Sequence, residues 1–445
     1  MDSEIKRFAD VVRCKIRQGT IPEMEEIERG MREAALRDGS YALSTLLSEI
    51  PDYNESGLVC HHCKSVMENL GRRQKGIVTL LGDSTVSRMY YECSNPDCHE
   101  HRFPKDELLD ISDTSFSPGV RRLMAKVGSN DAFNKGSLDL QEFSGINVQA
   151  KDVERVSEAI GRGIEEKQQA EMKDYALKHP SPNIEKTIPI IYVECDGTGV
   201  PVTARELDGR KGKQADGSAK TREAKLGCVF TQTSTNETGK PIRDSNSTSY
   251  VGSIESVGFF GKRIEAEAVR RGLWAAETVV FLGDGAKWVW NLADEHFFGA
   301  IQIVDFYHAS EHLHKVLQYI YDSQQKLNEQ EPEWVTMLEE GKIAEIISKA
   351  KALYQSNNLD SSKNFEKEIG YFKENESRMS YADFKQKGFF IGSGVIEAGC
   401  KAVIGKRLKQ SGMRWSVKGA NSIIALRCSL LSGRFDEYWE NRRAA

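Results

Sequence analysis

The sequence predicts a multidomain α+β protein in which a mixed β-sheet is accompanied by several groups of helices. Apolar residues recur with helical spacing near the N-terminus and again between residues 309 and 388. Between residues 185 and 308, apolar and β-branched runs alternate with turns and one helical stretch, which favours a sheet covered by helices. Two close pairs of cysteines lie between residues 57 and 110 and predict a small metal-binding domain.

Residues 1–56 are predicted to form an N-terminal helical region. Their apolar residues stand at intervals that place them on one face of a helix. The members of this stripe are Met24, Ile27, Met31, Leu36 and Leu43. We expect a packed pair of helices, and the alternative is a helix that pairs with a partner or with a second copy of the chain.

Residues 57–110 are predicted to form a zinc-ribbon-like domain. The segment contains Cys-x2-Cys, then 29 residues with a β-rich pattern, then Cys-x4-Cys. Four thiolates brought together by a hairpin match the tetrahedral site that structural Zn²⁺ requires. The ligands ranked first are Cys60, Cys63, Cys93 and Cys98. One of the neighbouring histidines can replace a cysteine, and four unligated thiols are the other alternative.

Residues 111–180 are predicted to be helical and to contain a helix-turn-helix. A helix is followed by a turn through Gly145 and by a second helix with one apolar face. That face consists of Val153, Val156, Ile160 and Ile164. A helix-turn-helix can place its second helix in the major groove of DNA. A helical pair that never contacts DNA is the alternative.

Residues 185–308 carry five predicted strands. The first three are separated by turns, and the last two follow a helical pattern. The strands are "TIPIIYVECD", "AKLGCVFTQT", "STSYVGSI", "TVVFLGDGA" and "AIQIVDFYH". Residues 309–388 show helical patterns without strands, and residues 389–445 begin with a glycine-bounded turn that leads into a basic helix.

Three acidic residues lie in apolar or glycine-rich surroundings. Asp196 and Asp284 each end an apolar strand and precede a glycine turn, and Glu397 lies near the start of a helix. Taken singly, each is explained as a turn or cap residue. Together, carboxylates at strand ends repel one another unless a cation neutralises them, and Mg²⁺ binds few carboxylates while keeping positions for phosphate oxygens. We therefore interpret Asp196 as a metal ligand presented by a rigid strand.

Charge is unevenly distributed along the chain. The net charge of −5 argues against a general nucleic-acid-binding protein, yet residues 398–435 contain eight Lys and Arg and no Asp or Glu. With no run of eighteen apolar residues and no apolar leader, we expect neither membrane span nor signal peptide. The five scattered cysteines indicate reduced thiols and a cytoplasmic protein.

Several motifs in order along residues 58–435 resemble the IS-Kra family of bacterial insertion-sequence transposases, which are related to Mutator-like transposases. They are "DGTGVPV", "GRKGKQADGSAKTREAKLGCVFTQ", "FLGDGAKWVWNLADEHFFGAIQIVDFYHASEHL" and "GSGVIEAGCK", preceded by "TLLGDSTVSRMYYECSNPDC" and "FPKDELL". The resemblance implies an RNase H-like catalytic core over 185–308, a helical insertion over 309–388, and core C-terminal helices over 389–445. The implied Asp-Asp-Glu triad is Asp196, Asp284 and Glu397, holding two Mg²⁺ or Mn²⁺ ions.

The motif "DFYH", Asp305 to His308, is similar to an element that follows the second aspartate in Mutator-like transposases. We expect His308 to contact the scissile strand or to hold a strand–helix junction, in a supporting role. Asp305 is the rival of Asp284 because it too ends an apolar strand. The glycines on both sides of Asp284 favour Asp284.

Two basic segments are predicted to contact DNA through its phosphates. The first contributes Arg210, Lys211, Lys213, Lys220 and Arg222. The second contributes Lys401, Lys406, Arg407, Lys409 and Arg414, with Trp415 either stacked on an unpaired base or buried. The resemblance implies that the partners are terminal inverted repeats and target DNA, and that the chain forms a homodimer or larger homo-oligomer. Such a protein is expected in the bacterial cytoplasm, associated with the nucleoid when bound to DNA.

Two other functions fit the same residues. An RNase H-like nuclease that cuts DNA without joining strands would use the same triad. A zinc-containing DNA-binding regulator with an inert catalytic block is the alternative from another class. Strand-transfer products distinguish the first alternative, and metal-dependent cleavage excludes the second.

Overall fold

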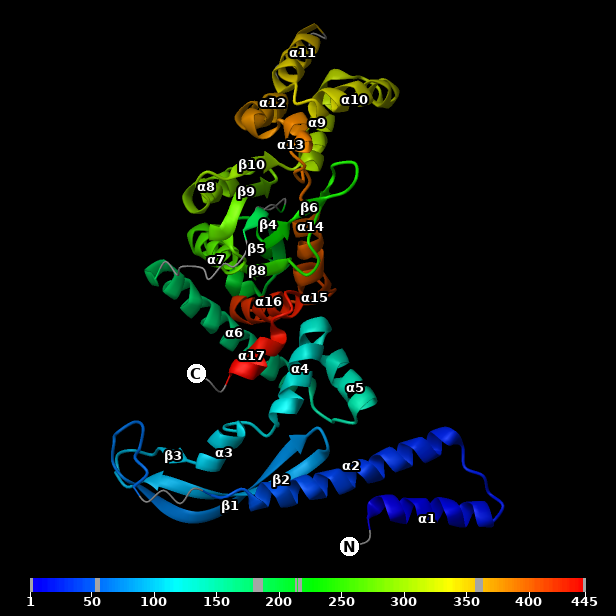
Figure 1. Cartoon of the computed structure of the whole chain (residues 1–445), viewed down its shortest axis with the longest axis vertical. Coiled ribbons are helices and arrows are strands. Elements are labelled where there is room, and N and C mark those ends of the chain that lie inside the picture. Colours follow the sequence, from blue (N-terminus) through cyan, green and yellow to red (C-terminus); the bar gives the residue numbers. More distant parts are fainter. Residues whose placement is uncertain are drawn as a thin grey trace. The chain divides into compact units, whose positions relative to one another are not determined.

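The computed structural model describes residues 3–52, 57–178, 187–212, 214, 218–356 and 363–442, and it is a mixed α+β structure (Figure 1). The chain divides into two compact units, residues 1–157 and 158–445. The division falls within one long helix, inside the region predicted as a helix-turn-helix domain. The six predicted domains divide the chain more finely than this, and their boundaries stay predictions.

The first unit contains a helical pair and a long antiparallel hairpin. Its elements are α1 (Glu4–Arg17), α2 (Met24–Glu49), β1 (Met67–Thr79), β2 (Gly82–Cys93), β3 (His101–Arg102), α3 (Pro104–Leu109), α4 (Pro118–Asn130) and α5 (Phe133–Ser144). The ring of Phe8 on α1 packs where Gly30 of α2 has no side chain. Leu47 of α2 joins Ile77 and Val86 of the hairpin in a small core. The predicted pair of packed N-terminal helices is therefore confirmed.

The predicted helix–turn–helix segment has the expected secondary structure. Helix α5 ends at Ser144, and Gly145 adopts a left-handed conformation with φ of +72°, which is a common helix terminator. Helix α6 (Ala150–Lys178) follows and begins with its predicted apolar residues buried. In the first unit, Ser157 donates a hydrogen bond to the carbonyl of Met124 on α4. The DNA-binding role of this segment stays a prediction.

A five-stranded mixed sheet forms the centre of the second unit, in the order β10-β9-β4-β5-β8. The strands are β4 (Ile188–Pro201), β5 (Thr221–Gln232), β8 (Ser249–Ser253), β9 (Ala276–Gly283) and β10 (Ile301–Val304). Strand β4 pairs antiparallel with β5 and parallel with β9, and β10 is parallel to β9. The predicted mixed sheet is thus confirmed. The short pair β6 (Ser234–Thr235) and β7 (Pro241–Ile242) was not predicted.

The predicted turn directly after Asp196 is wrong, because β4 continues through Asp196 to Pro201. Gly197 and Gly199 lie inside the strand and pair with β5. A Cβ atom at Gly197 would lie 2.7 Å from the carboxylate of Glu223, and one at Gly199 would lie 2.8 Å from the hydroxyl of Thr221. The two glycines therefore make room for side chains on the neighbouring strand, as glycines within strands often do.

Helices cover both faces of the sheet. On one face, Phe260 and Ile264 of α7 (Val257–Arg270) fill the space beside Gly227 of β5, and α8 (Lys287–His296) follows β9. On the other face lie α14 (Gly394–Gly399) and α16 (Val417–Leu431). Helix α14 continues as a π-helical stretch (Cys400–Gly405) and α15 (Lys406–Leu408), and α17 (Phe435–Asn441) ends the described chain.

The region between β10 and α14 is helical, as predicted (Figure 1). It contains α9 (Phe306–Ile320), α10 (Gln324–Glu339), α11 (Ile343–Ser356), α12 (Lys363–Asn375) and α13 (Tyr381–Gln386). None of the helices in the described part of the chain has both the length and the hydrophobicity that a bilayer crossing requires.

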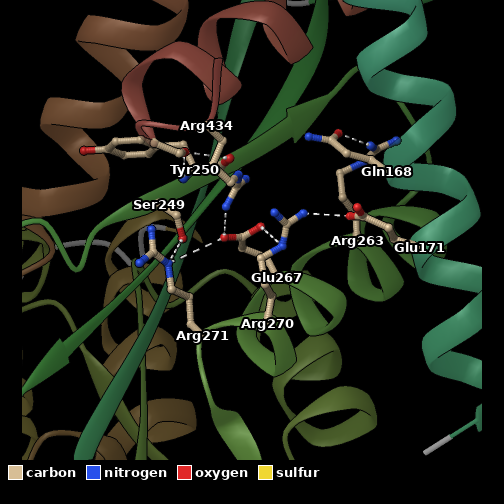
Figure 2. Close-up of polar contacts among 10 residues, drawn as sticks. Gln168, Glu171, Ser249, Tyr250, Arg263, Glu267, Arg270, Arg271 and Arg434 are labelled. Carbon is tan, nitrogen blue, oxygen red and sulfur yellow. Dashed lines mark hydrogen bonds and ion pairs between the residues drawn. The ribbon is translucent and has the colours of Figure 1, made fainter. Parts of the chain in front are cut away.

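A polar network joins α7 to α6, to β8 and to the segment between α16 and α17 (Figure 2). Glu267 of α7 is buried and lies 2.5 Å from the guanidinium of Arg434. Arg270 pairs with Glu171 of α6 at 2.7 Å, and Arg271 donates to the hydroxyl of Ser249 on β8 at 2.8 Å. These contacts attach the C-terminal helices to the sheet on which the candidate site lies.

Candidate functional site

Four cysteines meet at one end of the β1–β2 hairpin. Cys60 and Cys63 precede β1, Cys93 ends β2, and Cys98 lies in the following turn. Their sulfur atoms all lie within 4.8 Å of one another, with 3.8 Å between Cys60 and Cys98 and 3.3 Å between Cys63 and Cys93. Four thiolates around one Zn²⁺ ion, at about 2.3 Å from the metal, stand about 3.8 Å apart. The cysteine cluster therefore fits a tetrahedral zinc site.

The surroundings of the cysteine cluster act on its thiols in opposite directions. Hydrogen bonds from Ser65 lower the pKa of Cys63 to about 5, whereas burial and the neighbouring thiols raise the pKa of Cys93 and of Cys98. A bound Zn²⁺ ion would favour the thiolate form, which is the form that binds metal. The apolar core at this end of the hairpin is small: besides the cysteines it contains Leu58, Met67 and Tyr91, with Met89 packed against it. Within the described residues, none of the neighbouring histidines belongs to the group of four sulfur ligands.

A second set of polar side chains lies where three parallel strands end. Asp196 lies in β4 two residues beyond its last pair with β9, Asp284 directly follows β9, and Asp305 directly follows β10. Parallel strands bring their carboxyl ends to the same edge of a sheet, which is where α/β proteins place their sites. We refer to Asp196, Asp284 and Asp305 together as the acidic edge.

Asp196 is half-buried at the acidic edge and faces the helix that carries Glu397. Its carboxylate accepts hydrogen bonds from the backbone N–H of Gly197 at 2.6 Å and from the thiol of Cys400 at 3.4 Å. Burial raises the pKa of Asp196, and the charge of Asp284 raises it further, while these two hydrogen bonds act in the opposite direction. A bound cation would stabilise the charged carboxylates and so oppose both raising effects, which makes a divalent ion a suitable partner for the acidic edge.

Asp284 is held in a tight turn by the helical region between β10 and α14. Its side chain accepts a hydrogen bond from the N–H of Ala286 at 2.9 Å, and its carbonyl accepts one from the hydroxyl of Tyr371 on α12 at 2.9 Å. Gly285 has φ of +95°, and a Cβ atom there would lie 2.4 Å from the Tyr371 ring. The second glycine of "GDG" therefore serves both the turn and this close approach.

Glu397 lies in the first turn of α14 and shares a group of ligand atoms with Asp305 and His308. One ligand atom from each of these three side chains lies within 4.8 Å of the others. Asp196 and Asp284 are not members of this group, which is the second of two such groups among the described residues. The grouping makes Asp305 and His308 stronger candidates for metal ligands. The predicted triad of Asp196, Asp284 and Glu397 stays a prediction.

Asp305 is fully buried and already has structural partners. Its side chain caps α9 by accepting a hydrogen bond from the N–H of His308 at 2.7 Å, and it also accepts one from the N–H of Ser393 before α14. It therefore holds the start of two helices, a role that Asp284 does not have. His308 is partly exposed in the first turn of α9.

Three residues near the acidic edge were not predicted: Glu194, Tyr371 and Cys400. Glu194 precedes Asp196 by two residues, so the alternation along a strand puts both on one face of the sheet. A glutamate inside an apolar strand was a signal that sequence reasoning could have used. Tyr371 lies 87 residues from its partner Asp284, and nothing in the sequence near Tyr371 indicates this contact.

The first basic segment lies between β4 and β5. Arg210, Lys211 and Lys220 are exposed, and Arg222 at the start of β5 donates to the carbonyl of Glu206 at 3.3 Å. Lys213 lies outside the described residues. These positions are compatible with contacts to DNA phosphates, which stay a prediction.

The second basic segment is divided by burial. Lys401, Lys406, Lys409 and Arg414 are exposed, and the amine of Lys409 bonds to the hydroxyl of Thr198 beside Asp196 on β4. Arg407 is fully buried, with its guanidinium 4.9 Å from the ring centre of Trp415. This position does not fit the predicted DNA contact of Arg407, because the side chain is shielded from solvent. Trp415 is buried too and donates to the carbonyl of Leu408, which excludes base stacking at this surface.

Comparisons with known proteins place the chain in no family. No protein-family model matches the chain, and no curated protein matches it significantly. Among solved structures, a Drosophila P element transposase strand transfer complex is similar with a TM-score of 0.23 and 11% sequence identity. The similarity covers 72% of this chain and 80% of that chain. A TM-score of this size does not establish a shared fold.

Proposed function

We propose that the chain is a DNA transposase that cuts and joins DNA at the acidic edge with the help of divalent cations. The observation that carries the proposal is the arrangement of carboxylates around the parallel strand ends of a mixed five-stranded sheet. Asp284 and Asp305 directly follow β9 and β10, Asp196 lies within the adjacent strand β4 beyond its last pair with β9, and Glu397 enters from a helix on one face. A mixed sheet with this arrangement supports an RNase H-like catalytic core.

The proposed metal ligands are Asp196, Asp284 and Glu397, with Asp305 and His308 as the rival set. Neighbouring carboxylates that repel one another are the donors expected for Mg²⁺ or Mn²⁺, and the charge of Asp284 contributes to the raised pKa of Asp196. Bound divalent ions would activate the attacking oxygen and neutralise charge on the phosphate. His308 is partly exposed and shares a ligand group with Glu397; in this proposal it would contact the scissile strand or hold the strand–helix junction.

Substrate binding in this proposal depends on exposed cations near the acidic edge. Lys409 lies beside Thr198, two residues beyond Asp196, and Lys401 and Lys406 follow Glu397 on the same helical stretch. Cations at these positions can pair with phosphates on either side of the cut bond. The zinc-ribbon-like domain and the helix-turn-helix are proposed to bind terminal inverted repeats. Because two element ends must be joined, a dimer or larger oligomer is part of the proposal.

A strand-transfer assay tests the function directly. The substrate is a plasmid carrying the DNA segments that flank the coding sequence, incubated with Mg²⁺ and either wild-type protein or the Asp196→Ala variant. We expect joined products from the wild type alone. Cut products without joined products would favour the nuclease, and DNA binding without any cleavage would favour the regulator. Equal activity of both proteins would remove Asp196 from the site.

A further inference from the structure

Glu194 is a fully buried carboxyl group in the centre of the sheet, two residues before Asp196. One oxygen, Oε2, accepts a hydrogen bond from the N–H of Ile396 at 2.8 Å and one from the thiol of Cys228 at 3.6 Å. The other oxygen, Oε1, has no hydrogen-bond partner among the described residues. Burying a carboxyl group with an unpaired oxygen costs stability, so this side chain calls for an explanation beyond packing.

Helix α14 is capped in an unusual way. The third N–H group of a helix is normally satisfied by the side chain of the N-cap residue, for which serine is among the preferred choices. The N-cap of α14 is Ser393, but its side chain makes no capping hydrogen bond. The N–H of Ile396 instead bonds to Glu194, which lies 202 residues earlier in the sequence. The cap therefore joins the strand of Asp196 to the start of α14.

A second buried carboxylate fixes the same helix start. The N–H of Ser393 donates to Asp305, at the end of β10. Two acidic side chains, one from the middle of β4 and one from the end of β10, thus accept N–H groups at the start of α14. Glu397 directly follows Ile396, so these two bonds fix the backbone from which its side chain projects.

We infer that Glu194 is a positioning residue that orients Glu397 for metal binding by capping α14. The inference rests on the proposed function, because it requires Glu397 to be a metal ligand. Groups that orient metal ligands without contacting the metal often change metal affinity when they are removed. A cap by the Ser393 hydroxyl would not require a buried carboxyl group. The cap by Glu194 instead couples the start of α14 to the strand that presents Asp196.

Binding of Mn²⁺ to the full-length protein, followed by electron paramagnetic resonance, provides a readout independent of DNA cleavage. Glu194→Leu removes the acceptor at similar volume, and Glu194→Asp shortens the side chain so that it no longer reaches Ile396. We expect either change to weaken Mn²⁺ binding about 10–100-fold. Glu194→Gln keeps an oxygen acceptor for the Ile396 N–H and should restore affinity to within about threefold of the wild type.

A double-mutant cycle with Glu397→Gln separates positioning from a general structural effect. If Glu194 acts through Glu397, the loss caused by Glu194→Leu disappears when Glu397 has already been replaced. The control is Ser256→Ala, which removes an ordinary cap, the hydrogen bond from the N–H of Phe259 in α7. It should lower thermal stability and leave Mn²⁺ affinity unchanged.

The outcomes distinguish the inference from the proposed function. Unchanged affinity in Glu194→Leu, or in Glu194→Asp if the leucine variant does not fold, would overturn the inference. The inference would also be overturned if Glu194→Leu lowered Mn²⁺ affinity equally in the wild type and in the Glu397→Gln variant. A wild-type protein whose Mn²⁺ binding does not depend on Glu397 would instead overturn the metal site of the proposed function.

Discussion

The cysteine cluster and the acidic edge are both candidate metal sites, but they are built over different distances along the chain. Cys60 and Cys98 lie 38 residues apart, on one hairpin. Asp196 and Cys400, which share a hydrogen bond at the acidic edge, lie 204 residues apart. The cysteine cluster has few apolar residues around it, whereas the acidic edge rests on a sheet in which the central stretches of β4 and β5 are buried. The first site should therefore depend on its metal for folding, and the second should fold without metal.

Removal of the metal from the cysteine cluster is expected to have the largest effect. Structural Zn²⁺ contributes about 10–16 kcal/mol to the folding of small zinc domains, and the few apolar residues of this cluster cannot replace that. Chelation, or the substitution Cys63→Ser, should expose the amides of β1 and β2 to hydrogen exchange while β4 and β9 stay protected. Bound zinc is measured in parallel.

The matched control for this experiment is Cys14→Ser, because Cys14 is exposed on α1 and lies apart from the four sulfur ligands. It should leave both the zinc content and the exchange pattern unchanged. If β1 and β2 stay protected without metal, the hairpin folds by packing alone. This result would contradict the expected dependence of the cysteine cluster on metal.

Removal of a proposed metal-binding carboxylate should abolish strand transfer and leave the fold intact. We expect Asp196→Asn and Glu397→Gln to reduce strand transfer about 10³-fold or more, since a lost metal ligand costs several kcal/mol in the transition state. Their thermal stability should not fall.

Asp305→Asn provides the contrast at the same edge. Asparagine can cap α9 but cannot accept both backbone N–H groups that Asp305 accepts, so about 1–3 kcal/mol of stability should be lost. Activity lost in Asp305→Asn at unchanged stability, with Asp284→Asn still active, would move the metal site to Asp305, His308 and Glu397.

Gly285→Ala tests how closely the acidic edge depends on distant packing. The position has φ of +95°, and the new methyl group would meet the Tyr371 ring, so we expect a loss of about 1–3 kcal/mol in unfolding free energy. Strand transfer should fall as the Asp284 turn shifts. Adding Tyr371→Ala should relieve the steric part of the defect and leave the backbone part. A fully stable, active Gly285→Ala variant would contradict this account.

In metal-free protein, the pH dependence of thermal stability should show that the charged Asp196 side chain destabilises the native state. Burial raises the pKa of Asp196 above its usual value of 3.8, so the native state binds the proton more tightly than the unfolded state. The charged side chain then destabilises the protein increasingly as pH rises through the window above 3.8. Asp196→Asn should raise the melting temperature at pH 7 and raise it by less at pH 4. An equal effect at both pH values would contradict this cause.

The smallest expected effect separates two neighbours in the second basic segment. Lys406 is exposed and Arg407 is fully buried. Lys406→Ala should lower the slope of log affinity for DNA against log salt by about 1, the amount for one phosphate contact. Arg407→Ala should leave that slope unchanged and lower the melting temperature, because its packing on Trp415 is lost. The reverse pattern would return Arg407 to the DNA surface.

Features that depend on short stretches of chain could be predicted from the amino-acid sequence. The cysteine spacing and the β-rich stretch between the pairs predicted the cysteine cluster, because a hairpin closes over few residues at small entropic cost. Alternation and apolar runs located the strands around Asp196, Asp284 and Asp305. Gly145 marked the end of α5, because a left-handed helix terminus favours glycine at that one position.

The contacts between side chains that are distant in the sequence became known from the three-dimensional structure. It showed that β4 continues past Asp196, that Arg407 packs on Trp415, and that Tyr371 holds the Asp284 turn. It also brought Glu397 together with Asp305 and His308, and linked Ile396 to Glu194. Each of these contacts joins segments whose local patterns are satisfied in many arrangements. Long-range packing of the sheet and its helices selects one arrangement, and the local sequence patterns do not indicate which one it is.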